Sequence, residues 1–307
     1  MEVKYIKRIS ENKILFHFII DKINSYFYFA SFMITAIIKI SRPVNFFITF
    51  FAVIIAALIS SKSINDVNII FAALAMSFAC SAGNIFNDIV DVEIDKINKP
   101  DRVLPKEIIS IKFAKILYGI FIILSSVCAF YNGTNSFLFL AVVNSFLVLY
   151  STHLKKTILV GNFSVALLTA SALIYGAMIA GNINAGIIPA FFAFFANFIR
   201  EIIKDMEDVE GDSANNINTF PKIYGNKKTF RIILLSTVLL ILFSFIPFVY
   251  KIYSIEFFII IMTVVNPLFI IMLKILYKSQ NLDALRKASA IVKLNMIIGL
   301  FAIYAGA

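Results

Sequence analysis

Residues 67–102 read VNIIFAALAMSFACSAGNIFNDIVDVEIDKINKPDR, and their order of apolar and acidic residues sets the fold class. The first part, 67–88, is almost entirely apolar, and a helix needs about 20 such residues to cross a bilayer. The second part, 89–102, carries a series of acids. Because charged side chains are costly near a bilayer, a span that runs directly into acids predicts a membrane protein with a function at that end.

Apolar runs of the same kind recur along the whole chain. Of the 307 residues, 60% are hydrophobic and 15% are charged, whereas about a quarter of a soluble domain is charged. This composition excludes an ordinary soluble enzyme, a disordered chain and a disulfide scaffold. It predicts an all-α polytopic protein with nine membrane-spanning helices, at 43–60, 67–88, 112–130, 135–152, 158–180, 186–204, 229–250, 254–277 and 287–306.

The basic residues fall on one side of the predicted membrane. Of the 28 Lys and Arg, 26 lie on the same side as the N-terminus and only Lys62 and Lys251 lie on the other. Because Lys and Arg collect in cytoplasmic loops, this split predicts a multi-pass protein of the cell membrane with a cytoplasmic N-terminus. The net charge of +10 therefore reflects orientation rather than nucleic-acid binding.

Residues 1–42 form a segment of their own. Apolar side chains at helical spacing predict an amphipathic helix in the membrane interface: Phe16, Ile19, Ile20, Ile23 and Phe27. Residues 26–40 are apolar enough for a rival span, but a full crossing would mix the charges of the two sides. We expect an in-plane or re-entrant segment, and no removable signal peptide, because the N-terminus lacks a compact apolar core with a cleavage site.

The remaining residues, 43–307, are expected to form one helical bundle. Spans 67–88 and 186–204 both run into acids, and the two acidic segments lie about 118 residues apart. This spacing indicates two pseudo-repeats followed by a ninth helix.

Each acidic segment, if helical, presents one polar stripe. Steps of three or four residues align the first stripe, which is Asn84, Asn87, Asp88, Asp91 and Asp95. The same steps align the second, which is Glu201, Asp205, Asp208 and Asp212. Both stripes lie at the predicted cytoplasmic ends of their spans, so we expect them to face each other.

Carboxylates at this spacing repel one another, and a divalent cation removes that repulsion. Mg²⁺ prefers oxygen ligands and often shares them with substrate phosphates, so two facing stripes would hold a diphosphate through Mg²⁺. Six bases on the same side would contact phosphate oxygens: Lys99, Arg102, Lys155, Lys156, Arg200 and Lys204. The alternative is that these charges are solvated and only cap helices at the interface.

Short motifs in and beside these segments resemble those of the UbiA-type intramembrane prenyltransferases. The matching motifs are Asn87-Asp88-x-x-Asp91-x-x-x-Asp95 with Asn98-Lys99-Pro100-Asp101-Arg102, Asp208-x-x-x-Asp212 preceded by Asp205, Ser41-Arg42-Pro43-x-Asn45, and Tyr150-x-x-x-x-Lys155. The family spacing after Tyr150 is one residue shorter, so Lys155 and Lys156 both remain candidates. The resemblance covers about residues 40–307.

The resemblance implies nine helices around a central cavity, a cytoplasmic cap, and Mg²⁺-dependent transfer of a prenyl group from a prenyl diphosphate. The metal–diphosphate would be held by Asn87, Asp91, Asp95, Asp208 and Asp212. Phosphate contacts would come from Lys99, Arg102, Lys155 and Lys204, and Tyr150 would shield the allylic cation. Further substrate contacts would come from Arg42, Asn45, Asp88 and Asp205.

The segment REIIKDMEDVEGD, residues 200–212, most resembles the archaeal branch of the family. That branch makes digeranylgeranylglyceryl phosphate, an ether lipid. The resemblance therefore implies geranylgeranyl diphosphate as donor and the sn-2 hydroxyl of geranylgeranylglyceryl phosphate as acceptor.

Three other functions stay open. An aromatic prenyltransferase of quinone biosynthesis would use the same motifs with an acceptor such as 4-hydroxybenzoate. A secondary transporter also uses repeats and intramembrane acids, but its sites lie near the bilayer midplane, whereas these acids cluster at one membrane face. A non-catalytic membrane scaffold would not depend on the acids at all.

Overall fold

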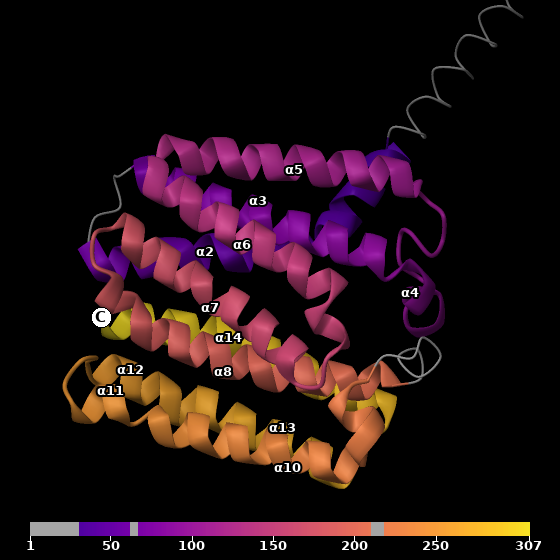
Figure 1. The fold of residues 1–307 in the computed structure, drawn as a ribbon. Helices are drawn as coiled ribbons and strands as arrows, with labels where there is room; N and C mark the ends of the chain where they lie inside the picture. The colour runs from indigo at the N-terminus through magenta and orange to yellow at the C-terminus, as the bar shows by residue number, and fades with distance from the viewer. Residues whose placement is uncertain (1–30, 62–66, 210–217) are drawn as a thin grey trace, which may run out of the picture.

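The computed structural model describes residues 31–61, 67–209 and 218–307, and within these ranges the regular secondary structure is all helical, joined by turns and short links (Figure 1). In this described part of the chain, nine helices, counting those that continue across a break, are long and apolar enough to cross a membrane, which confirms the predicted spans. The elements are α2 (Pro43–Ser61), α3 (Val67–Val90), α4 (Val92–Asn98), α5 (Ile111–Tyr131), α6 (Thr134–Thr152), η1 (Leu154–Lys156), α7 (Val160–Ile179), α8 (Ile183–Glu207), α10 (Phe220–Phe243), α11 (Ile246–Val249), α12 (Ile255–Ile260), the π-helical η2 (Ile261–Val265), α13 (Asn266–Lys278) and α14 (Leu282–Gly306).

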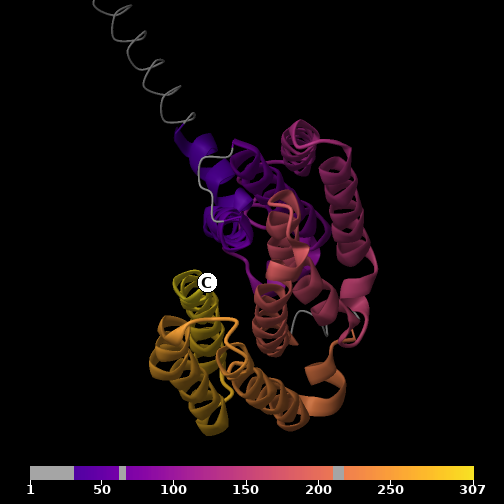
Figure 2. The same ribbon diagram turned by 90° about the vertical axis from the view of Figure 1, so that its left-hand side faces the viewer.

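The long helices lie side by side along one direction, so the links between them gather at two ends of the molecule (Figure 1). Seen along the helices, the early spans and the last spans form two groups, with α7 and α8 between them (Figure 2). The most extensive contacts between helices are those of α7 with α8, α3 with α5, and α2 with α3. The acidic α4 lies at the end of the bundle where α8 also ends (Figure 1).

Small residues allow α2 and α7 to pack closely. A Cβ atom placed on Gly176 in α7 would lie 2.3 Å from the backbone oxygen of Val53 in α2. Helix packing in a bilayer relies on such small residues because lipid supplies no hydrophobic driving force between helices.

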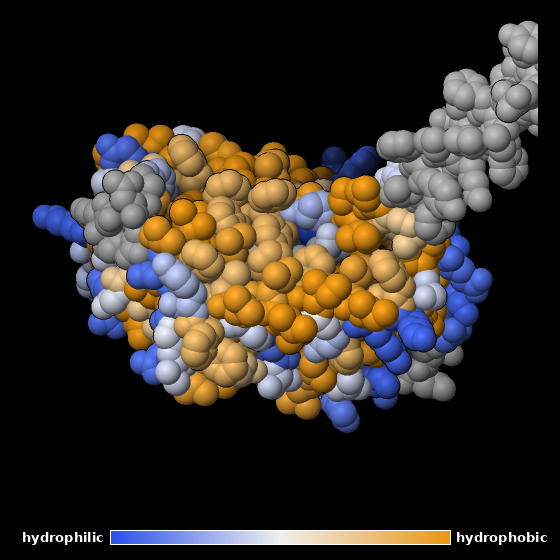
Figure 3. Space-filling view, turned by 90° about the horizontal axis from the view of Figure 1, so that it is seen from above, coloured by the Kyte–Doolittle hydropathy of each residue, from blue (hydrophilic) through white to orange (hydrophobic). Residues whose placement is uncertain are grey.

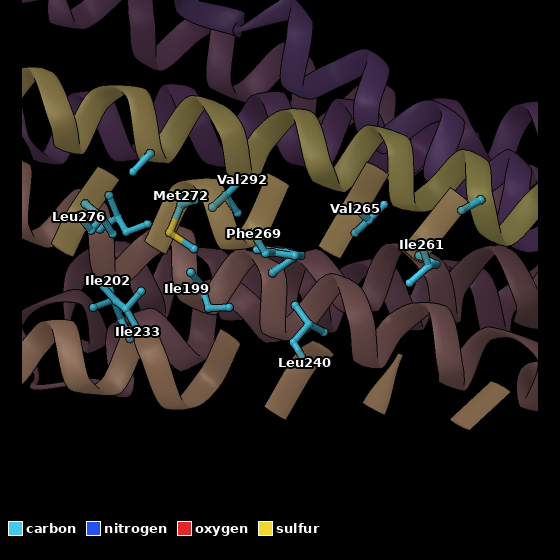
Figure 4. Packing of buried hydrophobic residues seen from close by; sticks show 14 of the residues in the cluster. Ile199, Ile202, Ile233, Leu240, Ile261, Val265, Phe269, Met272, Leu276 and Val292 are labelled. Carbon is cyan, nitrogen blue, oxygen red and sulfur yellow. The ribbon is translucent and has the colours of Figure 1, made fainter. Parts of the chain in front are cut away.

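A second group of helices is held together by aliphatic and aromatic side chains. In Figure 4, residues of α8, α10, η2, α13 and α14 meet in one layer, with Ile199, Phe269, Met272 and Val292 near its middle. This packing fixes α8 and α14 relative to each other, which matters because both contribute polar side chains to the site described below.

The surface agrees with a membrane protein. Figure 3 shows hydrophobic side chains over the middle of one face and hydrophilic ones toward the two ends of the helices. Many large apolar side chains are exposed on the spans, including Ile123, Phe130 and Val142. A lipid environment explains this exposure, since a soluble protein rarely shows such continuous apolar surface.

The predicted N-terminal segment is described only in part. Residues 31–41 form a short apolar helix, Ser31–Ser41, whose Ala36 and Ile40 are buried against Ile85 of α3 and Leu117 of α5. The proposed amphipathic stretch from Phe16 to Phe27 lies outside the described residues, so its interfacial position stays a prediction.

Candidate active site

The first acidic segment continues the helical path of α3 into α4. Asp91 separates the two helices, yet the backbone hydrogen bonds continue through it. The Asp91 N–H donates to the backbone oxygen of Asn87 at 2.9 Å, and the Asp95 N–H donates to the backbone oxygen of Asp91 at 2.8 Å. Asn87, Asp91 and Asp95 therefore stay on one face and line one polar cavity, as the helical spacing predicts. Asp88 is directed to Arg42 and Arg102 and is not among the lining residues of this cavity.

The second segment meets the first directly. Glu201, Lys204 and Asp205 of α8 line the same cavity, and Asp208 follows at the end of the helix. The Lys99 ammonium lies 2.5 Å from Asp208 Oδ2, and the Asn98 amide donates to the Asp208 backbone oxygen at 3.1 Å. The two predicted acidic rows thus face each other, although Asp212 lies outside the described residues.

Among the described residues, equal numbers of acids and bases line the polar cavity. Its charged lining residues are Asp91, Asp95, Glu201, Asp205 and Asp208 with Arg42, Lys99, Arg102, Lys155 and Lys204. Asp91 is paired with Lys155, Asp95 with Arg102, and Asp205 accepts a hydrogen bond of 2.8 Å from the Asn162 amide. Burial is therefore compensated for each of these carboxylates by a base or an amide.

The lining residues fit a hard divalent cation. Within the described residues, no three His, Cys, Asp or Glu side chains are close enough to form a metal-binding group, because the acids contact bases instead. The cavity nevertheless offers carboxylate oxygens from both segments. Asn87 Oδ1 is buried without a hydrogen-bond partner, as expected for an oxygen that would serve as a ligand to a metal ion.

The pKa values of Asp95 and Arg102 reflect their burial together. Desolvation raises the pKa of Asp95 above the usual range, and the positive charge of Arg102 counters this in part. Desolvation also acts to lower the pKa of Arg102, but Asp88 and Asp95 outweigh it, so the net shift is upward. The guanidinium therefore stays charged and screens the two acids from each other.

The other predicted residues divide between two cavities. Lys155 lines the polar cavity, whereas Lys156 is exposed and does not, so the structure favours Lys155 for phosphate contact. Tyr150 and Arg42 line both the polar cavity and a central cavity beneath it. Arg42 adopts a left-handed φ of 50° between the helix Ser31–Ser41 and α2. Non-glycine residues rarely adopt this conformation, and such strain concentrates at functional sites.

The central cavity has a volume of about 510 Å³ and is enclosed by α2, α3, α6, α7, α8 and α14. Asn45 lies in this cavity rather than in the polar one. The apolar walls come from aliphatic side chains and Met, such as Ile48, Met76, Leu147 and Leu168, and no Phe of the described ranges lines them.

Several polar residues in the two cavities were absent from the predicted site. Asn162, Asn197 and Lys293 were not predicted. Arg200, which was expected to contact phosphate, lines only the central cavity, and Glu201 of the second acidic stripe lines both cavities. Lys293 had a usable signal, because it is an ionisable residue inside a predicted span, and such residues usually face a cavity. Asn162 and Asn197 had no such signal in the sequence, since an isolated amide in an apolar run does not reveal which way it faces.

Comparison with known proteins agrees with this architecture. The UbiA prenyltransferase family model matches residues 46–297. A digeranylgeranylglyceryl phosphate synthase from Methanosphaera stadtmanae is 32% identical over 274 residues, which cover 88% of this chain and 98% of that protein.

Two solved structures extend the comparison. A digeranylgeranylglyceryl phosphate synthase structure superimposes with a TM-score of 0.67 at 32% identity, covering 89% of this chain and 98% of that one. A UbiA homologue from Archaeoglobus fulgidus, solved with GPP and Mg²⁺, has a TM-score of 0.60 at 17% identity, covers 87% and 99% of the two chains, and supports the fold alone. The nine spans, the two facing acidic segments and these matches together show that the chain belongs to the UbiA prenyltransferase family.

Proposed function

We propose that this prenyltransferase is a digeranylgeranylglyceryl phosphate synthase, which transfers a geranylgeranyl group from geranylgeranyl diphosphate to the sn-2 hydroxyl of geranylgeranylglyceryl phosphate. The observation that carries the proposal is the meeting of both acidic segments at one polar cavity, with a lipid-sized cavity beneath it. Similarity to synthases of this name over nearly their whole length supports the choice of acceptor.

The polar cavity is the proposed site of the donor diphosphate. Mg²⁺ would be held by Asn87, Asp91, Asp95, Asp208 and Asp212, and it would supply positive charge that stabilises the departing diphosphate. The bases that now contact the acids, Lys99, Arg102 and Lys155, would then bind phosphate oxygens together with Lys204. The equal numbers of acids and bases leave the cavity suited to a metal–diphosphate rather than to either ion alone.

The bond that breaks is the allylic C1–O bond of the donor, and the electron pair leaves with the diphosphate. The acceptor oxygen then forms the new C1–O ether bond and releases its proton. Tyr150 borders both cavities, where its ring would shield the allylic carbon, and the aliphatic walls below would exclude water. Arg42 also borders both cavities and would orient the substrates without taking part in bond formation, while Asp88 would hold Arg42 in place through their ion pair.

The distribution of Lys and Arg along the sequence supports a position of the site at the cytoplasmic face of the membrane. The soluble diphosphate product would then leave into the cytoplasm, while the lipid product stays in the bilayer.

A direct assay tests the function. Purified protein receives radiolabelled geranylgeranyl diphosphate with geranylgeranylglyceryl phosphate and, separately, with 4-hydroxybenzoate. We expect label in the glyceryl phosphate product, loss of turnover in excess EDTA and recovery with Mg²⁺. Label transferred only to the aromatic acid would reassign the protein to aromatic prenylation, and full activity in EDTA would contradict the metal role.

A further inference from the structure

The central cavity has a charge balance different from that of the polar cavity. Among the described residues, the single carboxylate of Glu201 lines it together with five bases: Arg42, Arg102, Arg200, Lys204 and Lys293. Arg42 and Arg102 also contact Asp88 and Asp95, which lie outside its lining, so the five bases contact three carboxylates in all. A surplus of positive charge at the border of an apolar chamber favours a bound anion that brings no metal ion with it. The polar cavity, with five acids and five bases, lacks such a surplus.

Lys293 is the base that most clearly lacks an acidic partner. Its ammonium donates to Asn45 Oδ1 at 3.1 Å across the interface of α14 and α2, and it forms no ion pair with any carboxylate among the described residues. A Lys ammonium has three donors, so two remain for a ligand. The contact with Asn45 fixes its position at the cavity wall.

The neighbouring wall on α8 carries buried donors without partners. Arg200 uses Nη1 to contact Glu201 at 3.1 Å, but its Nε is buried and has no hydrogen-bond partner. Asn197, one turn earlier, is only 5% exposed, and its Nδ2 also lacks a partner. Unpaired buried donors are costly, and an anion with several acceptor oxygens would satisfy them together.

The cavity turns apolar immediately beyond this cluster. Met296 lies one turn after Lys293 on α14 and lines both the central cavity and a neighbouring apolar pocket, as do Ile48, Ala52 and Thr169. That pocket continues between α8, α10, α13 and α14. A ligand with an anionic head and a long hydrocarbon chain matches this arrangement, in which a basic cluster is followed by an apolar pocket.

We propose that Lys293, Arg200, Asn197 and Asn45 bind the phosphate of the lipid acceptor, at a site that is separate from the donor diphosphate and requires no Mg²⁺. The proposal rests on the proposed function, because it assigns the anionic acceptor a position. Arg42, Asn87, Arg102, Tyr150, Glu201 and Lys204 line both cavities, so an acceptor anchored here would present its hydroxyl beside the donor.

Binding of the acceptor alone provides the test. Binding of radiolabelled geranylgeranylglyceryl phosphate and of the neutral geranylgeranylglycerol is measured in detergent that contains EDTA. The proteins compared are wild type, Lys293→Met and Asn197→Asp. Wild type should prefer the phosphate. Lys293→Met should weaken phosphate binding by about 10- to 100-fold, with little effect on the neutral lipid, because only the charge is removed. Asn197→Asp should also weaken binding of the phosphate lipid, because it adds a negative charge at the same wall.

Controls separate this site from a structural effect. Lys287→Met changes an exposed Lys on the same helix and should bind both lipids as wild type does, and Lys293→Arg should recover much of the phosphate preference. In turnover assays, Lys293→Met should raise the KM for the acceptor and leave the KM for the donor unchanged.

Three results would overturn the inference. They are loss of wild-type binding of geranylgeranylglyceryl phosphate in EDTA, an equal loss of affinity for both lipids in Lys293→Met, and a Lys293→Met variant in which the KM for the donor rises instead of the KM for the acceptor. The wild-type assay with 4-hydroxybenzoate tests the proposed function independently. A wild type that prenylates only that acid but still binds the glyceryl phosphate through Lys293 would refute the function and leave the anion site in place.

Discussion

Single side chains set the charge balance on which the proposed chemistry depends. Asp91 and Asp95 are buried, and each contacts one base, Lys155 or Arg102. When the metal–diphosphate binds, each acid would contact the metal ion in place of its base, and the base would contact a phosphate oxygen. Removing either partner therefore affects donor binding and chemistry, and removing the base also leaves a buried carboxylate without compensation.

Replacing a cavity acid should reduce turnover strongly. Asp91→Ala and Asp208→Ala each remove a carboxylate from one acidic segment, and we expect kcat to fall by about 100-fold or more, because charge on the leaving diphosphate is less stabilised. Asp101→Ala, an exposed acid in the same link, is the control and should leave kcat unchanged. Wild-type kcat in both cavity variants, measured with radiolabelled donor, would support the scaffold alternative.

Arg102 should act mainly on the donor. It contacts Asp88 at 3.1 Å and is paired with Asp95, and it lines both cavities. Arg102→Ala should raise the KM for geranylgeranyl diphosphate by about 10-fold or more, and Arg102→Lys should restore part of the affinity. Steady-state kinetics with the donor varied at saturating acceptor measures this. An unchanged donor KM would remove Arg102 from the diphosphate site.

At the scale of helices, the site depends on how closely α2 approaches α7. Gly176 permits this approach, because its missing Cβ would otherwise meet the backbone of Val53 at 2.3 Å. Since α2 carries Asn45 and begins just after Arg42, a displaced α2 would move both residues away from α8 and α14. Helix packing therefore controls site geometry from a distance.

A pair of glycine substitutions tests this packing. Gly176→Ala should destabilise the protein by about 1–3 kcal/mol, because backbone must move to admit the methyl group. Gly119→Ala in α5 is the matched control, since nothing lies within 4 Å of its Cβ position, and alanine should stabilise the helix there by about 0.5–1 kcal/mol. Thermal unfolding in detergent distinguishes them, and equal shifts in both variants would contradict the close-packing argument.

At the scale of the molecule, membrane orientation determines which compartment supplies the diphosphate. The span from α12 to α13 runs from the end near Tyr250 to the end near Lys278, and both side chains are exposed. The distribution of Lys and Arg predicts that the Lys278 end faces the cytoplasm.

Labelling tests that orientation. In a background without Cys80 and Cys128, Tyr250→Cys should react with a membrane-impermeant maleimide on intact cells, and Lys278→Cys only after permeabilisation. The opposite pattern would place the acidic cap outside the cytoplasm. The unsubstituted cysteine-free protein is the control for background labelling and for retained turnover.

The number and approximate limits of the spans followed from the sequence, because a bilayer imposes a minimum apolar length that composition alone reveals. The pairing of the acidic segments also followed from it, since both end spans on the same side. The faces of Asn87, Asp91 and Asp95 were predictable for a similar reason, because helical spacing places them together.

Tertiary structure decided what local pattern cannot encode. The sequence motif left Lys155 and Lys156 as equal candidates, and only the fold places Lys155 beside Asp91. Lys293 and Asn45 are 248 positions apart and meet only because α14 packs against α2. Spacing along one helix fixes which side chains share a face, but contacts between distant helices depend on the packing of the whole bundle, to which every span contributes.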